Sequence, residues 1–203
     1  MVTTRFFQGM KRGRGVAAVS GLFFVCTGLL TAGEAFAFSV SYDQEVTVGD
    51  RVITSTVRLK DEQFRVDTPL EGASDVIIRN PSGVYHYMSN ARTAQRLSVS
   101  SLLEYDAKDL EDFLGYLSDQ HATVIGSETI HGYPCDIYRF TDQSSGEVIT
   151  TWVWKDKRFP VKIEQQLPQG RVVAVMTNVQ VGVDIPDAVF QLPADTQVLD
   201  SAP

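Results

Sequence analysis

The sequence is poor in the residues that bind metals or act as nucleophiles. It has two cysteines, Cys26 and Cys135, and three histidines, His86, His121 and His131, in 203 residues. Zinc sites group such ligands at short helical or hairpin spacing, and these histidines lie far apart in the chain. A Cys–His catalytic pair needs a partly exposed thiolate, whereas the alternation around Cys135 predicts burial. We therefore expect no metal site and no catalytic cysteine.

Other functional signatures are also lacking. No serine lies in a Gly-x-Ser-x-Gly elbow, and no glycine-rich phosphate loop opens a helix. Basic residues are scarce, because 18 Lys and Arg stand against 25 Asp and Glu, for a formal net charge of −7. A nucleic-acid backbone needs clustered positive charge. The sequence therefore predicts no enzyme, no cofactor and no nucleic-acid partner.

Long hydrophobic runs are limited to one, from Val16 to Leu30, within the first 37 residues. A basic segment precedes the run and Ala35-Phe36-Ala37 follows it, which is the layout of a secretory signal peptide. The run has about 15 residues, fewer than the roughly 20 that cross a bilayer, although a retained signal anchor is the alternative. We predict cleavage after Ala37, a periplasmic protein, and a single domain over residues 38–203.

The rest of the chain reads as successive strands. Apolar and polar residues alternate over 38–48, as they do in a half-buried antiparallel strand. Polar or glycine-containing turns recur about every 8–12 residues, which is typical of a meandering β structure. The predicted strands cover residues 38–48, 51–59, 63–66, 74–79, 84–88, 122–130, 135–140, 147–155, 159–167 and 171–183.

One helix interrupts the strands, over residues 106–117. Its apolar side chains follow the 3.6-residue period of one helix face, and Asp106 is the expected N-cap. Gly115 weakens this helix by about 1 kcal/mol relative to alanine. The apolar positions are Leu110, Phe113, Leu114 and Leu117. Such a helix needs an apolar surface to cover, and the sheet supplies one.

The end of the chain carries a short apolar segment, residues 185–193. Pro186 is expected to start a helical turn, with Phe190 and Leu192 as its anchors. Beyond Pro193 the chain is expected to fray.

Aromatic residues are frequent on the predicted strands. Trp152 and Trp154 are two residues apart and so share one side of their strand. Large aromatics commonly fill a core, and the alternative is that they line an apolar cavity between sheet and helix. The candidate lining residues are Phe64, Tyr85, Tyr87, Leu110, Phe113, Leu114, Leu117, Trp152 and Trp154.

Four segments together resemble a known superfamily. They are Ile130-His-Gly-Tyr-Pro-Cys-Asp-Ile-Tyr138, Trp152-Val-Trp-Lys155, Phe159-Pro160-Val-Lys-Ile163 and Asp187-Ala-Val-Phe190-Gln-Leu-Pro193. Their order along the chain, after a leader and with one central helix, is similar to that of the periplasmic lipoprotein carriers. These form the LolA-like superfamily, with the outer-membrane receptor LolB and the lipoprotein-sorting proteins.

The resemblance implies a mainly β protein, an unclosed antiparallel half-barrel with a short central helix as its lid. It also implies a cavity for lipid or lipoprotein acyl chains, used in lipoprotein trafficking to the outer membrane. Arg58 and Arg65 are, by strand position, candidates for the polar residue that the carriers place inside that cavity. The alternative is a non-catalytic interaction or envelope-sensor module with a filled interior, whose partners are envelope proteins. The sequence leaves the oligomeric state and the role of Cys135 open.

Overall fold

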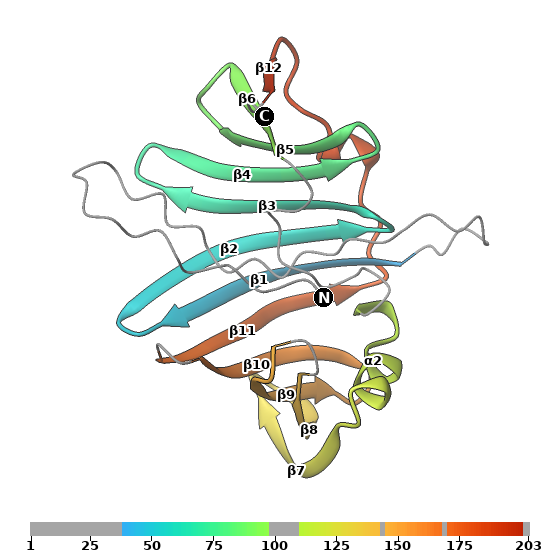
Figure 1. Ribbon diagram of the computed structural model, residues 1–203. Coiled ribbons are helices and arrows are strands. Elements are labelled where there is room, and N and C mark those ends of the chain that lie inside the picture. The colour runs from blue at the N-terminus through green and yellow to red at the C-terminus, as the bar shows by residue number, and fades with distance from the viewer. Residues whose placement is uncertain (1–37, 98–109, 143–144, 168–169, 201–203) are drawn as a thin grey trace.

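The computed structural model describes residues 38–97, 110–142, 145–167 and 170–200 (Figure 1). The leader expected over residues 1–37 lies outside this part of the chain. Within it, twelve strands form one sheet, joined by an α-helix and a 3₁₀ helix. The first six strands are β1 (Ser39–Val48), β2 (Arg51–Lys60), β3 (Gln63–Leu70), β4 (Ala73–Asn80), β5 (Gly83–Met88) and β6 (Thr93–Leu97). The others are β7 (Thr123–Ile130), β8 (Tyr133–Thr141), β9 (Val148–Trp154), β10 (Phe159–Leu167), β11 (Gly170–Val181) and β12 (Gln197–Asp200).

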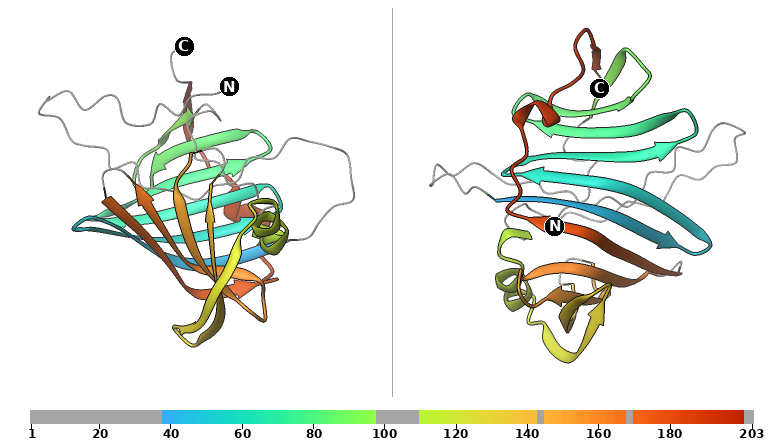
Figure 2. Two further views of the ribbon diagram at one scale, coloured as in Figure 1. Left: turned by 60° about the horizontal axis from the view of Figure 1, so that its bottom comes forward. Right: turned by 180° about the vertical axis from the view of Figure 1, so that it is seen from behind.

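The strands run in the order β12-β6-β5-β4-β3-β2-β1-β11-β10-β9-β8-β7. All neighbours are antiparallel except β12 and β6, which pair in parallel. The sheet curls strongly, and its two edge strands, β7 and β12, lie at opposite ends of the molecule (Figure 2). The expected mainly β, unclosed half-barrel is therefore confirmed.

Alternating burial explains how the sheet acquires two different faces. In β1, Val40, Tyr42 and Val46 are buried, while Glu45 between them is exposed. β1 pairs with β2 without a register shift, so Tyr42 lies opposite Val57 and the apolar side chains of the two strands share one face. Gly49 has a φ of 59° in the turn between the strands, a conformation that glycine adopts without strain.

The described part of the expected helix over residues 106–117 is helical at Leu110 and Glu111 and continues, after Asp112, as helix α2. Helix α2 covers Phe113–Asp119, and Asp112 is its N-cap, because an Asp112 carboxylate oxygen accepts a hydrogen bond from the Gly115 amide at 3.0 Å. The expected cap, Asp106, lies outside the described residues. Phe113 and Leu117 are buried, as the apolar stripe predicts. No helix of the described chain has the length and apolar composition needed to span a membrane.

Buried apolar residues form two clusters. The large cluster includes side chains of α2 and of β1, β2, β3, β8, β9, β10 and β11. The small cluster lies around Tyr85 and Tyr87 of β5 and Phe190 of the 3₁₀ helix η2 (Asp187–Phe190). Strand register separates the two clusters at β3 and β4. Val66 of β3 pairs with Ile77 of β4, and both belong to the large cluster. Val76, the residue before Ile77, belongs to the small cluster. The clusters therefore lie on opposite faces of these strands.

The chain after β11 forms a strap, residues 183–190, that crosses the sheet to its far edge (Figure 2). Pro186 precedes η2, and Phe190 is fully buried, so the expected helical turn and its main anchor are confirmed. Fraying beyond Pro193 is wrong, because Gln197–Asp200 forms β12 along β6. The backbone pairing with β6 orders this segment, which carries too few apolar residues for its strand to be evident from sequence.

Candidate functional site

The structure gathers most of the predicted cavity residues in the large cluster. Leu110, Phe113, Leu114 and Leu117 come from the helical segment, Phe64 from β3, and Trp152 and Trp154 from β9. Phe64, Phe113 and Leu117 are each 2% exposed. These seven side chains belong to, or pack against, one connected cluster of buried apolar residues.

Tyr85 and Tyr87 are the exceptions, because they belong to the small cluster. Tyr85 pairs with Ile78, and Tyr87 pairs with Val76, which places all four on the face that carries the strap. Burial raises the pKa of Tyr87 above its ordinary value. These two tyrosines therefore do not contribute to an apolar surface shared with Phe64.

Helix α2 packs on the β8–β9 end of the large cluster through aromatic rings. Phe113 and Tyr116 stack with their ring centroids 5.6 Å apart. Tyr116 meets Phe140 of β8 edge to face at 5.9 Å, and Phe140 lies opposite Ile149 of β9. The helix therefore covers the face of β8 and β9 that presents Phe140 and Ile149.

Trp152 lies on the other side of β9 from Ile149, because the two are three residues apart in an unbroken strand. Its indole nitrogen donates to Glu128 of β7 at 2.8 Å. The Lys162 ammonium stands 4.0 Å from the centre of the Trp152 ring. Trp152 is thus fixed by a carboxylate and a cation, in polar surroundings that differ from those of the α2 side chains.

The large cluster continues across β1–β5 as one apolar surface. Val57 and Leu59 of β2 lie beside Phe64 and Val66 of β3, and Ile77 of β4 lies beside Val66. All five belong to the large cluster. None of these five side chains is ionisable, and each is at most 8% exposed. The surface that they form is called here the apolar face. Arg79 and His86 lie on the same side of the sheet, opposite Phe64 and Ile77.

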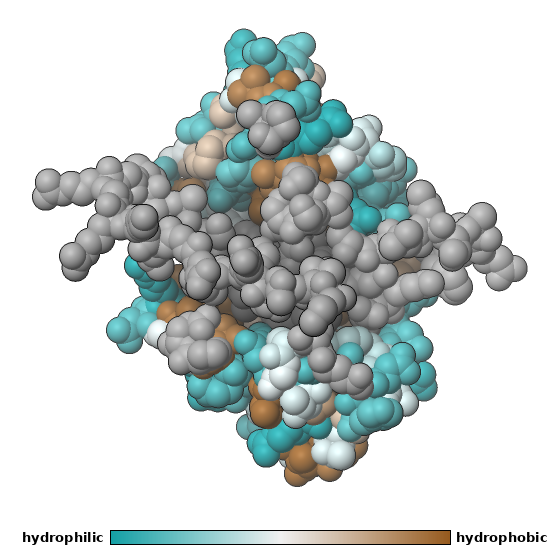
Figure 3. All heavy atoms as spheres, in the orientation of Figure 1, coloured by the Kyte–Doolittle hydropathy of each residue, from teal (hydrophilic) through white to brown (hydrophobic). Residues whose placement is uncertain are grey.

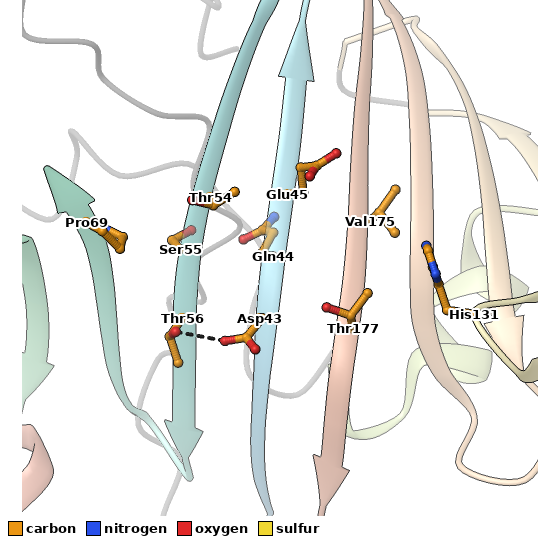
Figure 4. Close-up of a pocket in the computed structure, with 10 residues that line it drawn as sticks. All are labelled: Asp43, Gln44, Glu45, Thr54, Ser55, Thr56, Pro69, His131, Val175 and Thr177. Carbon is orange, nitrogen blue, oxygen red and sulfur yellow. Dashed lines mark hydrogen bonds between the residues drawn. The ribbon is translucent and has the colours of Figure 1, made fainter.

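The opposite face of β1, β2 and β11 carries an open polar groove of about 380 Å³ (Figure 4). Asp43 is its most constrained group, because it accepts hydrogen bonds from Asn178 at 2.7 Å and from Thr56 at 2.8 Å. These bonds, the one from Asn178 first, lower the pKa of the Asp43 carboxyl. The lining residues are Asp43, Gln44, Glu45, Thr54, Ser55, Thr56, Pro69, His131, Val175 and Thr177.

Sequence reasoning missed this groove. The available signal was the polar half of the alternation, with Asp43 and Glu45 on β1 and Thr54 and Thr56 on β2. His131 could not be placed there from sequence, because it comes from the β7–β8 turn and reaches the groove only through the curl of the sheet.

Arg58 and Arg65, the candidates for a polar residue inside a cavity, lie on the face opposite the apolar face. Arg58 of β2 lies opposite Arg65 of β3, and each is adjacent in the chain to a residue of the apolar face, Val57 or Val66. Both bind Asp67, Arg58 at 2.9 Å and Arg65 at 2.7 Å. Strand alternation, which sequence position alone had not resolved, directs them away from the apolar surface.

Cys135 lies in the large cluster and is 1% exposed, and burial raises the pKa of its thiol. A buried thiol with a raised pKa is a poor nucleophile. His86 is instead paired with Asp75, at 2.5 Å. Across the described ranges, no three His, Cys, Asp or Glu side chains gather in a way that could hold a metal ion.

With this geometry established, the chain can be assigned to a class. The model of the DUF4412 family, a domain of unknown function, matches residues 46–158, more than half of the sequence. The chain therefore belongs to the DUF4412 family. The match runs from within β1 to the turn after β9. No curated protein matches the sequence.

Solved structures show the same fold at low sequence identity. An uncharacterized conserved protein from Thermus thermophilus has a TM-score of 0.57 and 10% identity, over 82% of this chain and 93% of that chain. MucB of Pseudomonas aeruginosa, solved in complex with MucA, has a TM-score of 0.55 and 15% identity, over 80% of this chain and 58% of that one. This chain thus spans a little over half of the MucB chain. MucB shares the LolA-like fold, and the expected resemblance is confirmed for the fold alone.

Proposed function

We propose that this protein is a non-catalytic binding protein of the periplasm that holds acyl chains of a lipid or lipoprotein against its apolar face. The observation that carries the proposal is the extent of that face, from Val57 to Ile77 across three strands and on through the large cluster to α2. Helix α2 has seven residues, and its ring contacts lie at the β8 end. The export leader predicted for residues 1–37 supports the location.

The chemistry of the apolar face suits this ligand. Burying an acyl chain contributes about 0.8 kcal/mol per methylene, so binding needs no polar motif. The ionisable pairs of β2 and β3, such as Arg58 with Asp67, point to the other face. A role in lipoprotein trafficking to the outer membrane would follow from acyl binding together with a periplasmic location.

Native mass spectrometry of the purified protein tests the proposal. We expect adducts of lipid mass that organic extraction removes and that vesicles of phosphatidylethanolamine and phosphatidylglycerol restore. A bare polypeptide mass before and after incubation with these vesicles contradicts acyl binding.

A pair of tryptophan variants locates the ligand. Val57→Trp fills the apolar face, and Thr56→Trp places the same ring on the opposite face, next to Asp43. We expect Val57→Trp to lose the lipid adducts at nearly unchanged Tm, whereas Thr56→Trp keeps them. If the interior is closely packed instead, Val57→Trp lowers Tm through overpacking, which costs about 1–3 kcal/mol.

A second candidate function is a periplasmic interaction module with a filled interior. The polar groove around Asp43 favours it, because an open surface with carboxylates, hydroxyl groups and an imidazole fits a polar protein segment better than an acyl chain. MucB, which has this fold, was solved in complex with MucA. Isolation of one specific envelope protein with the purified chain, in the absence of lipid, would support this candidate, and Glu45→Lys in the groove should then disrupt the complex.

A further inference from the structure

Strand β7 is an edge strand that is open to solvent along almost its whole length. It is the last strand in the sheet order and pairs with β8 on one side. Every residue from Thr123 to Thr129 is exposed, and Val124 and Ile125 are 60% and 46% exposed. Hydrophobic side chains gather at the end of the molecule where β7 lies (Figure 3). The outer side of β7 is therefore free to pair with another strand.

The turn between β7 and β8 determines which backbone groups of β7 face outward. His131 and Gly132 have φ angles of 47° and 86°, which is typical of a two-residue hairpin turn of type I′. The residues that flank such a turn, Ile130 and Tyr133, form a hydrogen-bonded pair. Hydrogen-bonded and non-hydrogen-bonded pairs then alternate along the ladder.

Ser127 and Thr129 consequently occupy non-hydrogen-bonded positions toward β8. Their partners are Asp136 and Pro134. Pro134 has no N–H group, which suits a position that donates nothing to β7. The N–H and C=O groups of Ser127 and Thr129 therefore point away from β8, toward an added strand.

The two edges of the sheet differ in how they are protected. β12 has four residues and carries a salt bridge between Arg96 of β6 and Asp200, at 3.1 Å. β7 has eight residues, with no lysine, arginine or proline and only one acid, Glu128. Soluble proteins usually protect an edge with short strands, charge or proline. The Glu128 carboxylate is also bound to Trp152, so β7 presents little charge against a partner strand.

We propose that β7 pairs antiparallel with β7 of a second copy of this chain, with Ser127 on the two-fold axis. In that register the outward groups of Ser127 bond to those of Ser127 in the second copy, and Glu128 faces Gly126. The neighbouring register, centred on Glu128, would oppose two carboxylates and is disfavoured.

The second copy is favoured as the occupant because β7 complements itself in this register. The irregularity between Val124 and Gly126 limits regular pairing to the segment that follows it. This pairing does not require lipid binding, because the apolar face lies on the sheet and not at its edge.

Disulfide trapping tests the register, in a background with Cys26→Ala and Cys135→Ala that removes both native thiols. Opposed residues of a hydrogen-bonded antiparallel pair have Cα atoms about 5.5 Å apart, within the range of a disulfide. Ser127→Cys should therefore give a disulfide-linked dimer on mild oxidation. Thr129→Cys is the matched control, because its two copies would lie four residues apart along the strands, about 13 Å. Equal trapping of both variants, or of neither, overturns the proposal.

Sedimentation velocity of the protein without added cysteines tests the pairing itself. We expect about twice the monomer mass for the wild type and for Ser127→Ala, which keeps the backbone N–H. Ser127→Pro should sediment as a monomer with an unchanged far-UV CD spectrum, because the N–H that it removes points away from β8. A wild type that stays monomeric at all concentrations shows that the edge does not bind a second copy.

Discussion

The two hydrophobic clusters are held together in different ways. The large cluster is held by apolar contacts between the strands and α2, including aromatic contacts such as that of Tyr116 with Phe140. The small cluster is closed by the strap, which polar side chains of the sheet fix through its backbone carbonyls. Packing alone is tolerant of changes in shape, whereas a set of directed hydrogen bonds fixes one position of a segment.

Four hydrogen bonds to backbone carbonyls hold the strap, and each donor comes from a different strand of β1–β4. Ser39 donates to the Val183 carbonyl at 2.7 Å, and Lys60 donates to that of Ile185 at 3.2 Å. The other two donors are Arg65, to the Val189 carbonyl at 3.2 Å, and Asn80, to the Phe190 carbonyl at 3.0 Å. One segment of chain thus links four strands, which makes this half of the sheet a distinct cooperative unit.

Removal of the Phe190 ring should have the largest effect on this unit. Phe190 is fully buried against Val76, Ile78 and Tyr85. Phe190→Ala is expected to lower the free energy of unfolding by about 3–5 kcal/mol. Hydrogen exchange should accelerate in β4–β6 more than in β8–β9, because the two clusters are separate. Equal acceleration in both regions would show that the clusters unfold as one unit.

Asn80 tests the hydrogen bonds of the strap rather than its packing. Its amide group donates to the Phe190 carbonyl, and its carbonyl accepts from the Ser82 amide at 2.9 Å. Asn80→Asp keeps the acceptor for Ser82 and removes the donor, so it leaves the Phe190 carbonyl unpaired at a cost of about 1–3 kcal/mol. Chemical denaturation measures this loss. A change in stability no greater than that of a surface substitution would mean that packing alone holds the strap.

Sequence patterns predicted the elements whose signal is local. The period-two alternation located β1 and gave β10 its observed bounds, 159–167, because each strand has one buried face. It missed β6 and β12, of five and four residues, because their formation depends on pairing between segments that are distant in the chain.

The candidate site could be predicted only in part, for a related reason. Alternation shows that Tyr85 and Tyr87 share a side of β5, but not that this is the opposite side from Phe64. That relation is fixed by the register of β3, β4 and β5. A shift of one residue in either pairing would have placed the tyrosines with Phe64. Composition and spacing carry no information on register at that precision.

Gly115 tests how α2 is held on the large cluster. A methyl group at Gly115 would collide with the Asp112 carboxylate that caps the helix. Gly115→Ala should therefore give no net gain, because about 1 kcal/mol of helix propensity is offset by loss of a cap of similar value. In an Asp112→Ala background the same substitution should stabilise the protein by about 1 kcal/mol. Thermal unfolding of the four proteins gives both values, and an equal gain in both backgrounds would exclude competition with the cap.

Acid should lower the stability of the face that carries the strap, because the Asp43 carboxylate on that face becomes protonated. This is the smallest of the predicted effects. Hydrogen bonds, the one from Asn178 first, lower the pKa of Asp43 below its ordinary value of about 3.8. The ionised carboxylate therefore stabilises the folded state above about pH 3.8, and this stabilisation is lost as the pH falls below that value. Asn178 has a φ of 52°, which glycine also adopts, so Asn178→Gly removes the hydrogen bond without backbone strain. We expect a loss of about 0.5–1 kcal/mol at pH 7, because Asp43 is partly exposed.

Urea denaturation of the wild type and Asn178→Gly at a series of pH values checks this expectation. The difference in stability should shrink as Asp43 becomes protonated, because a neutral carboxyl accepts a weaker hydrogen bond from the Asn178 amide. Phe190→Ala is the control, since it removes no titratable contact and its loss should persist in acid. A difference in stability between the wild type and Asn178→Gly that stays constant down to pH 3 would contradict this expectation. The stability would then come from the shape of the β11 irregularity and not from the charge of Asp43. The face that carries the strap would be no more sensitive to acid than the apolar face.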